Sequence, residues 1–314
     1  MVTAGAPPHV SVVIPTRDRP QLVEKALRSV LAQTYAELEV TVVDDGSTVP
    51  LVLDAALASD SRVRTLRIDE SIGAGAARNL AVADCRAPLL AFLDDDDTWR
   101  PTKLERQVEA LTAAGPDVDA AESGFDLWDG DRLVGRYVPA VMRDVARTLL
   151  ERPIMQPSTV LLRTEVFREL GGFEPGLRRV EDWDLWVRFS DAHRVVAVPE
   201  VHVDRTVSRP SDELHWYREM VRLLEHRIDA LPASERARLT AVHLLVESHL
   251  LAQVGERRQA RSAAARAVRT YPASWGRASL YIARSFMGER VWAKGKSLIC
   301  SLLGRTGREP TLPG

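Results

Sequence analysis

The sequence predicts an α/β fold, in which helices flank a mostly parallel sheet and a helical appendage follows at the C-terminus. Short β-branched runs alternate with amphipathic segments through the first hundred residues, as is typical of parallel strands joined by helices. Several of these runs end at Pro, Asp or Gly, where strands give way to turns. From about residue 211 only helical patterns follow. We therefore expect one domain over residues 1–210 and a helical region over residues 211–314.

The first half of the predicted sheet comes from four apolar runs. The expected strands are residues 9–15, 38–47, 62–69 and 88–94, and the helical patterns between them are residues 19–34, 49–59 and 72–85. In the first helix, apolar side chains recur at helical spacing at Leu22, Ala26, Leu27, Val30 and Leu31. These residues are expected to form the buried face of that helix.

After residue 97 the strict alternation stops. Residues 101–113 look helical, with Pro101 at a tolerated first-turn position. Residues 118–128 and 131–139 look like two strands joined by a turn at Gly130. Residues 156–173 read as a strand and a helix that stops at two glycines. The pattern is least regular over residues 120–180.

Composition and charge limit the classes of function. The chain is 45% hydrophobic and 27% charged, which is ordinary for a globular protein. Cys85 and Cys300 are too few for a disulfide framework or a zinc site. We find no signal peptide and no uncharged apolar run of about 18 residues, the length that would span a bilayer. A cytoplasmic protein is expected, with peripheral contact at the inner face of the membrane left open.

The formal charge is unevenly distributed. From Glu256 on there are twelve Lys or Arg against three Glu, a net charge of +9, so the part before it carries −11 of the total of −2. This asymmetry suggests an acidic partner for the tail. Residues 274–304 form a basic amphipathic pattern. Such a helix can lie in a membrane interface, or it can pack on the first domain or on a second subunit to form a homodimer.

Polar side chains follow three of the predicted strands, at the point where each strand ends. They are Pro15-Thr16, residues 44–47 and the four consecutive aspartates at 94–97. Since the carboxyl ends of parallel strands share one edge of a sheet, we expect a single site there. Two carboxylates about 5 Å apart repel by roughly 3 kcal/mol at an effective dielectric constant near 20. A hard divalent cation, Mg²⁺ or Mn²⁺, would offset this repulsion. The alternative is a solvated loop that caps the following helix.

Taken together, six stretches resemble the family-2 inverting glycosyltransferases of the GT-A fold. They are VSVVIPTRDRP, LRSVLAQTY, LEVTVVDDGST, GAGAARNLAV, LLAFLDDDDTW and EDWDLWVR, and the resemblance covers about residues 9–207. It implies an enzyme that moves a sugar from a nucleoside-diphosphate sugar to an acceptor hydroxyl, with Mn²⁺ or Mg²⁺ as the cofactor. UDP or dTDP is the expected nucleotide, with GDP left open. The acceptor would be a saccharide, a lipid-linked sugar or a small molecule in polysaccharide or glycoconjugate synthesis. No nucleic-acid partner is expected.

The resemblance also implies roles for residues at the first two strand ends. Pro15, Thr16 and Arg17 would line the nucleobase pocket. Asp44 would accept a hydrogen bond from N3–H of uracil or thymine, and Asp45 would steady the loop beside it. All five residues are thereby candidates for binding the nucleotide-sugar.

In the acid run, the resemblance makes Asp94 and Asp96 the D-x-D pair, with Asp96 the direct metal ligand. Asp95 would be the variable position beside the donor. A register shifted by one residue stays open, because Asp95 and Asp97 have the same spacing.

The glycine-led segment at 72–85 supplies a candidate arginine. Arg78 would contact the diphosphate or the nucleoside; the alternative is an ordinary surface arginine on a helix. Gly73 and Gly75 lack the third glycine of the dinucleotide fingerprint, so a phosphate-binding glycine loop is poorly supported.

Glu181 and Asp182 open a predicted helix that carries Trp183, Trp186, Val187 and Phe189 on its apolar face. Carboxylates are stabilised at a helix N-terminus, which is a sufficient explanation of their position if the segment is taken alone. The resemblance instead makes Asp182 the general base and Glu181 a hydrogen-bonding partner of acceptor or donor.

The end of the resembling region departs from the family pattern. Arg205 matches the arginine of a Tyr-Arg-x-His segment and would contact the diphosphate, but Val207 stands in place of the histidine. His202 is expected to be an ordinary strand residue that shares a face with Asp204. The third contact to metal or diphosphate therefore stays open.

Two other functions compete with this hypothesis. A sugar nucleotidyltransferase also uses a metal site at a sheet edge, but it needs a glycine-rich triphosphate loop that the segment PTRDRPQL does not provide. A non-catalytic nucleotide-sugar-binding protein is the second alternative, and the intact Asp182 and acid run count against it.

Overall fold

The computed structural model describes residues 9–140, 144–151, 154–177, 179–207 and 213–274. These residues form two compact units. The first contains residues up to 149 and residues 154–207, and the second contains residues 150, 151 and those from 213 on. The sequence predicts a division after residue 210, whereas the structure also assigns the short segment at residue 150 to the second unit.

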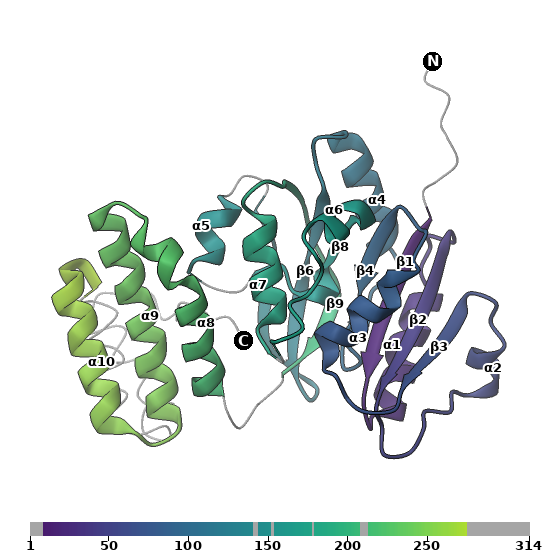
Figure 1. Ribbon diagram of the computed structural model, residues 1–314, viewed down its shortest axis with the longest axis horizontal. Coiled ribbons are helices and arrows are strands. Elements are labelled where there is room, and N and C mark those ends of the chain that lie inside the picture. Colours follow the sequence, from purple (N-terminus) through teal and green to yellow (C-terminus); the bar gives the residue numbers. More distant parts are fainter. Residues whose placement is uncertain (1–8, 141–143, 152–153, 178, 208–212, 275–314) are drawn as a thin grey trace. The chain divides into compact units, whose positions relative to one another are not determined.

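The first half of the sheet is parallel. Its strands are β1 (Val10–Thr16), β2 (Leu38–Asp45), β3 (Val63–Ile68) and β4 (Leu89–Phe92), and they lie side by side in the order β3-β2-β1-β4 (Figure 1). The register pairs Thr16 with Asp44 and Val13 with Phe92. As a result, the carboxyl ends of β1, β2 and β4 share one edge, as predicted.

The second half of the sheet mixes strand directions. It contains β5 (Thr98–Trp99), β6 (Ala120–Asp129), β7 (Arg132–Tyr137), β8 (Val160–Arg163) and β9 (Val195–Thr206). Strand β8 runs antiparallel to both β4 and β6, whereas β9 runs parallel to β6. The predicted α/β class is confirmed, and the parallel pairs are concentrated in its N-terminal half.

Helices cover both faces of the sheet. On one face, α1 (Pro20–Leu31) and α4 (Lys103–Ala114) pack over alternate strand residues such as Val12 and Ala91. On the other face, the ring of Phe92 lies 5.3 Å from that of Phe167 in α6 (Thr164–Glu169) and 5.1 Å from that of Phe173. The sheet is therefore a buried central layer that fixes the edge where its strands end.

The buried face of α1 differs from the prediction at Leu22, which is exposed, and at Leu31, which is only partly buried. The buried residues are Val23, Ala26, Leu27 and Val30, while Leu22 is 40% exposed. Val23 completes the spacing i, i+3, i+4 and i+7, which turns Leu22 towards solvent.

The helix predicted at residues 49–59 is also largely wrong. Only α2 (Ala55–Ala58) is helical, and it begins after Asp54, whose side chain accepts a hydrogen bond from the Ala56 amide. The preceding backbone is held by a long-range contact, because the Leu51 amide donates to Asp44 at 3.0 Å. A tertiary hydrogen bond thus replaces the first turn of the expected helix.

The other helices, strands and turns predicted in the first unit agree with the structure. The turn between β6 and β7 contains Gly130 at φ +60°, and α6 is followed by Gly171 and Gly172 at positive φ. Helix α7 (Glu181–Phe189) begins at Glu181 and buries the apolar side chains expected, including Trp186. Two short helical segments, α5 (Val145–Leu149) and η1 (Pro157–Thr159), precede β8.

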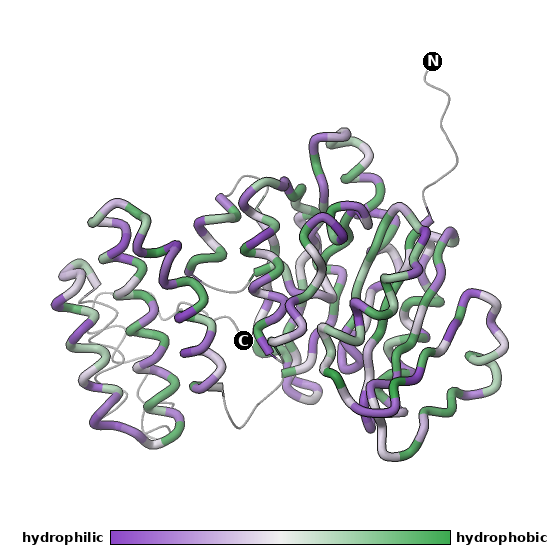
Figure 2. The backbone as a smooth tube through the Cα atoms, in the orientation of Figure 1, coloured by the Kyte–Doolittle hydropathy of each residue, from purple (hydrophilic) through white to green (hydrophobic). Residues whose placement is uncertain are grey.

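The second unit consists of helices. They are α8 (Glu213–Asp229), α9 (Ala233–Gln253) and α10 (Arg257–Thr270), followed by the single turn η2 (Pro272–Ser274). Figure 2 shows hydrophobic and hydrophilic residues alternating along these helices, and Leu245 of α9 belongs to the same core cluster as Ala264 and Ala267 of α10. No helix within the described ranges is long and apolar enough to cross a membrane. The amphipathic segment predicted at 274–304 lies, except for Ser274, outside the described residues.

Candidate functional site

Hydrogen bonds join the three strand ends at the sheet edge. The hydroxyl of Thr16 at the end of β1 donates to the carboxylate of Asp95 at 2.6 Å. The amide of Asp18 donates to the hydroxyl of Ser47 at 2.9 Å, and the amide of Thr48 donates back to Asp18 at 2.7 Å. The polar residues that the sequence placed on one edge are therefore in contact, although they are up to 79 positions apart in the chain.

The four consecutive aspartates divide into an inner and an outer pair. The side chains of Asp95 and Asp97 are only 8% and 2% exposed, whereas those of Asp94 and Asp96 are 27% and 26% exposed. Asp97 accepts hydrogen bonds from the hydroxyl of Ser158 at 2.7 Å and from the Thr206 amide at 3.1 Å. The inner pair is thus used to join loops, and the outer pair is the one that a ligand can reach.

An arginine that the sequence analysis missed lies against the acid run. One Nη of Arg19 donates to Asp95 at 3.0 Å and to Asp96 at 3.3 Å. Arg17, the predicted neighbour of the donor, is half-exposed and makes its ion pair with Asp18 at 3.6 Å. The only sequence signal for Arg19 is its place directly before Pro20, where α1 begins. The assignment of Arg17 to the nucleobase pocket stays a prediction.

Arg78 connects two parts of the site. Its guanidinium is 4% exposed and donates to Asp94 at 2.5 Å and to Glu181 at 3.3 Å, while its cationic carbon lies 5.2 Å from the centre of the Phe173 ring. The alternative of an ordinary surface arginine is therefore wrong. Gly75 lies one turn earlier on α3 (Ala74–Ala83) and allows Glu181 to come close to this helix, because a Cβ at position 75 would lie 2.9 Å from Glu181 Cγ.

Glu181 and Asp182 lie in the first turn of α7, next to this arginine. Asp182 is partly buried, and its desolvation together with the charge of Glu181 raises its pKa to about 6. The amide of Trp183 donates to Asp182 and opposes the shift. Val180, which precedes the pair, has φ +57°, a left-handed conformation that β-branched residues rarely adopt. The start of α7 is therefore held in an unfavourable backbone geometry that places these two carboxylates together.

We use the term acidic cluster for the six carboxylates of Asp94, Asp95, Asp96, Asp97, Glu181 and Asp182. The three arginines bonded to them are Arg19, Arg78 and Arg205. Six formal negative charges and three positive ones leave the acidic cluster with a net negative charge. Burial and the charges of Asp94 and Asp95 raise the pKa of Asp96, and burial raises the pKa of Asp97 to about 7. Burial is the larger cause of both shifts, and the neighbouring carboxylates add to it.

Asp44 and Asp45 lie at the end of β2, and both are buried. Asp44 accepts from the amides of Ser47 and Leu51, each at 3.0 Å, and from Arg67 at 2.5 Å. Burial would raise the pKa of Asp44, but these hydrogen bonds outweigh it and lower the pKa. Asp45 accepts hydrogen bonds from three groups of the following loop, the hydroxyl of Ser71 and the amides of residues 72 and 73. Arg67 is a further residue here that the sequence analysis did not identify.

The end of β9 supplies Arg205. Its Nε lies 3.4 Å from Asp97, and its guanidinium stacks 5.0 Å from the centre of the Phe125 ring. One of its Nη atoms is buried and has no hydrogen-bond partner among the described residues. His202 lies apart from the acidic cluster: it is buried, and its Nε2 lies 3.1 Å from Glu200.

The acidic cluster can be tested for its fit to a divalent cation. Within the described ranges, no group of three or more His, Cys, Asp or Glu is already arranged as a metal site. Mg²⁺ and Mn²⁺ do not require one, since they use one or two carboxylates and complete their shell with water and phosphate oxygens. Asp94 and Asp96 are the two outward carboxylates, and burial together with the charges of Asp94 and Asp95 raises the pKa of Asp96. Their position fits a cation that arrives together with a phosphate ligand.

Comparison with known proteins identifies the family. The profile of Glycosyl transferase family 2 matches residues 11–171, half of the chain. The chain belongs to this family and contains its glycosyltransferase domain. The match ends before Glu181, Asp182 and Arg205, so the assignments of these residues rest on their geometry and on the resemblance of the sequence motifs.

Individual relatives agree with the family. The succinoglycan biosynthesis protein ExoO of Rhizobium meliloti is 33% identical over 190 residues, which are 60% of this chain and 53% of that protein. The protein of Escherichia coli named UDP-Glc:alpha-D-GlcNAc-diphosphoundecaprenol beta-1,3-glucosyltransferase WfgD is 28% identical over 60% of this chain and 72% of its own length. An uncharacterized glycosyltransferase of Rickettsia felis is 27% identical over 64% of this chain, and the match spans only 33% of that relative.

The fold agrees with that of solved structures. TarS 1–349 of S. aureus in complex with UDP-GlcNAc superposes with a TM-score of 0.59 at 17% identity, covering 98% of this chain and 95% of that one. The complex of TarS 1–349 with UDP has a TM-score of 0.56. The mixed α/β fold is therefore of the GT-A type.

Proposed function

We propose that this protein is a metal-dependent inverting glycosyltransferase that moves a sugar from a UDP-sugar to an acceptor hydroxyl, with Asp182 as the general base. The observation that carries the proposal is the position of Arg78. It bonds at once to Asp94, one of the two outward carboxylates, and to Glu181, the neighbour of Asp182. One buried side chain thus links the proposed metal site to the proposed base.

The donor assignment rests on two supports. TarS, one of the structural neighbours, is known in complexes with UDP and UDP-GlcNAc, and the name of WfgD specifies UDP-Glc. In this chain, Thr16 and Asp44 lie at neighbouring strand ends beside the acid run, as a nucleotide that reaches from base to diphosphate requires. The nucleobase would lie near Asp44 and the diphosphate near Asp94 and Asp96. We propose UDP before dTDP or GDP on these grounds.

The chain's own residues supply the proton transfer. Asp182 would take the proton from the acceptor hydroxyl as the oxygen attacks the anomeric carbon on the face opposite the departing diphosphate. Its pKa of about 6 makes it a stronger base than an ordinary aspartate while leaving it ionised at neutral pH. A positioned base of this kind accelerates a reaction by about 10²- to 10⁴-fold. Glu181, which is held by Arg78, would stay in place to orient the acceptor or the donor sugar.

Asp94 and Asp96 would hold Mn²⁺ or Mg²⁺, which, when bound, stabilises the negative charge of the leaving diphosphate as a Lewis acid. Asp95 is already bonded to Thr16 and Arg19, and Asp97 to Ser158 and Thr206. Arg78 and Arg19 also contact Asp94 and Asp96, so the choice of register rests on exposure: the side chains of Asp94 and Asp96 are 27% and 26% exposed, against 8% and 2% for Asp95 and Asp97, which favours the pair at 94 and 96. Arg205, with a buried Nη free of hydrogen bonds to the described residues, is a candidate for the diphosphate contact.

The relatives suggest the class of acceptor. ExoO is named for succinoglycan biosynthesis, and the name of WfgD describes a sugar carried on diphosphoundecaprenol. We propose that the acceptor of this protein carries a saccharide and that the product belongs to a polysaccharide or glycoconjugate. The peripheral membrane contact suggested by the tail stays a prediction, since that segment lies outside the described residues.

Isothermal titration calorimetry with UDP in the presence of Mn²⁺ tests the proposal directly. We expect saturable binding that is lost in EDTA and in Asp96→Ala. Asp117→Ala, a change of an exposed aspartate away from the acidic cluster, serves as the matched control and should bind like the parent. The absence of metal-dependent binding by every nucleoside diphosphate tried would contradict the proposal, as would unchanged binding in Asp96→Ala.

A further inference from the structure

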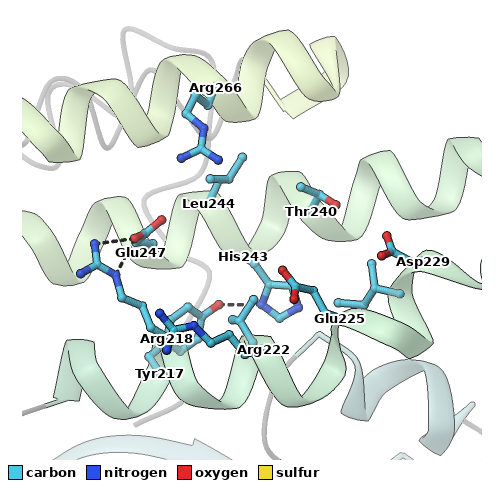
Figure 3. A pocket seen from close by; sticks show the side chains of 12 residues that line it. Tyr217, Arg218, Arg222, Glu225, Asp229, Thr240, His243, Leu244, Glu247 and Arg266 are labelled. Atoms are coloured by element: carbon cyan, nitrogen blue, oxygen red, sulfur yellow. Dashed lines mark hydrogen bonds and ion pairs between the residues drawn. The ribbon is translucent and has the colours of Figure 1, made fainter.

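The second unit contains an open groove between its helices, which we call the helical groove (Figure 3). It offers about 380 Å³ of space, and residues from α8, α9 and α10 line it. Ligand sites for small molecules have volumes of about 300 to 1,000 Å³. The groove is therefore large enough for a ligand of about two sugar rings, and none of the roles assigned so far uses it.

The floor of the groove is preorganised by a short hydrogen-bond chain. Nε2 of His243 lies 2.8 Å from the carbonyl oxygen of Leu150, so this nitrogen carries the proton that it donates. Burial lowers the pKa of His243 and keeps the ring neutral, so Nδ1 accepts from the hydroxyl of Tyr217 at 2.7 Å. The floor thus has a fixed tautomer and no net charge.

One wall of the groove is closed by an ion pair between two helices. Both Nε and Nη2 of Arg218 on α8 contact the same carboxylate oxygen of Glu247 on α9, at 2.8 and 2.7 Å (Figure 3). This pair fixes the separation of α8 and α9 along the groove.

Other polar groups of the helical groove are unused. Among the described residues, no hydrogen-bond or ion-pair partner is found for the side chains of Glu225, Asp229, Thr240 and Arg266. They comprise two acceptors, one hydroxyl and one donor, and they come from all three helices. A ligand in the groove would therefore meet free acceptors and free donors together.

The charges that line the groove cancel. Three arginines (Arg218, Arg222 and Arg266) face three acids (Glu225, Asp229 and Glu247), and His243 is neutral. A groove without net charge does not favour a polyphosphate or a polyamine. Val221, Ile228 and Leu244 add an apolar surface between the polar groups.

We propose that the helical groove binds a neutral saccharide, so that the second unit is a sugar-binding unit. Each sugar hydroxyl both donates and accepts hydrogen bonds, which matches the mixture of free carboxylates, arginine and threonine hydroxyl. The C–H faces of a sugar ring match the apolar surface. The further step, that this saccharide is part of the acceptor or product, rests on the proposed glycosyltransferase function; the binding itself does not.

The test uses the full chain and three probes. Cellobiose and N,N′-diacetylchitobiose represent neutral disaccharides, and inorganic pyrophosphate represents an anion. Saturation-transfer NMR titrations should give a dissociation constant on the order of 1 mM for at least one disaccharide. This value corresponds to a binding free energy of about −4 kcal/mol. In the double variant Glu225→Ala/Arg266→Ala the affinity should fall at least tenfold. Arg269→Ala, on the same helix α10 but outside the groove, should bind like the parent.

Each result supports or overturns the proposal that the helical groove binds a neutral saccharide. Equal disaccharide binding by parent and double variant overturns the proposal, as does the absence of saturable binding by both disaccharides. Pyrophosphate binding that the double variant abolishes overturns it in favour of an anion site. Hydrolysis of UDP-sugar is measured on the same preparations, and it should be unchanged in the groove variants. Failure of the proposed function would appear as absent hydrolysis in the parent, which is distinct from a loss of saccharide binding.

Discussion

The acidic cluster of the first unit and the helical groove of the second unit contain the same kinds of charged side chain in different proportions. In the acidic cluster, six carboxylates meet three arginines, and burial raises the pKa of Asp96, Asp97 and Asp182. In the groove, three carboxylates meet three arginines, and burial lowers the pKa of His243 and keeps its ring neutral. The first region has an excess of buried negative charge, and the second has none.

This difference indicates what each region can bind. Buried charge without a partner is costly, so the proposed cation, and the anion that it would bring with it, would stabilise the acidic cluster. The groove is already balanced, so it gains nothing from an ion and can offer its free donors and acceptors to a neutral ligand. The balance of formal charge thus separates a site suited to metal and diphosphate from one suited to sugar hydroxyls.

The largest expected effect is the loss of the proposed base. Asp182→Asn keeps the size of the side chain but cannot take a proton, so we expect kcat for sugar transfer to fall by about 10²- to 10⁴-fold. Mn²⁺-dependent UDP binding should persist, because Asp182 does not belong to the outward pair Asp94 and Asp96. Transfer assays and calorimetry on the same variant measure both quantities. Undiminished turnover would remove Asp182 from the role of base.

Removal of Arg78 should make the net charge of the acidic cluster more negative and so increase its difference from the balanced helical groove. Arg78→Met leaves Asp94 and Glu181 without their shared cation, and breaking a buried ion pair in this way costs about 3 kcal/mol or more in the free energy of unfolding. Urea denaturation measures the loss. Arg64→Met, a change of an exposed arginine on β3, is the control and should lie within about 0.5 kcal/mol of the parent. A stability equal to that of the control would show that Arg78 does not neutralise the cluster.

The raised pKa of Asp182 predicts a pH dependence of moderate size. The base must be ionised, and its pKa of about 6 means that the ionised fraction falls as the pH drops below that value. We expect kcat to be level above about pH 7 and about tenfold lower one unit below the pKa. A bound cation would favour the ionised form of Asp182, so the fall in kcat would then occur at a lower pH. Activity that rises as the pH falls from 7 to 5 would contradict the assignment of Asp182 as a base.

The smallest expected effect is a change in metal affinity when Arg19 is removed. The guanidinium of Arg19 contacts Asp95 and Asp96 and so reduces the repulsion between them, as a bound metal ion would. Arg19→Ala removes a competing positive charge, so we expect Mn²⁺ to bind roughly fivefold more tightly, about 1 kcal/mol at an exposed ion pair. Arg17→Ala, two residues earlier, is the control and should leave the affinity unchanged, because Arg17 pairs with Asp18. Titration by electron paramagnetic resonance gives both affinities. Weaker binding in Arg19→Ala would mean that Arg19 organises the carboxylates instead of competing for them.

Much of the fold was predictable because the relevant signals are local. The alternation of strand and helix patterns predicts β1 to β4 and the shared edge at which they end, and Glu181 was identified as the start of a helix. Predictions failed where a distant group decided the outcome. Asp44 holds the backbone at Leu51 and shortens the expected helix to α2, and the packing of α1 buries Val23 in place of Leu22.

The sequence by itself determined that an acid run follows a buried strand beside two other polar strand ends. The reason is that apolar runs and turn residues are local features, which can be read without knowledge of tertiary contacts. Only the tertiary structure decided which aspartates of that run are available. Thr16, Ser158 and Thr206 engage Asp95 and Asp97 from distant positions, and Asp94 and Asp96 are left outward. The same holds for Arg78, whose burial between Asp94 and Glu181 depends on α3 and α7 meeting. The physical reason is that side-chain type is local, whereas the partners that neutralise a buried charge are chosen by the packing of the whole unit.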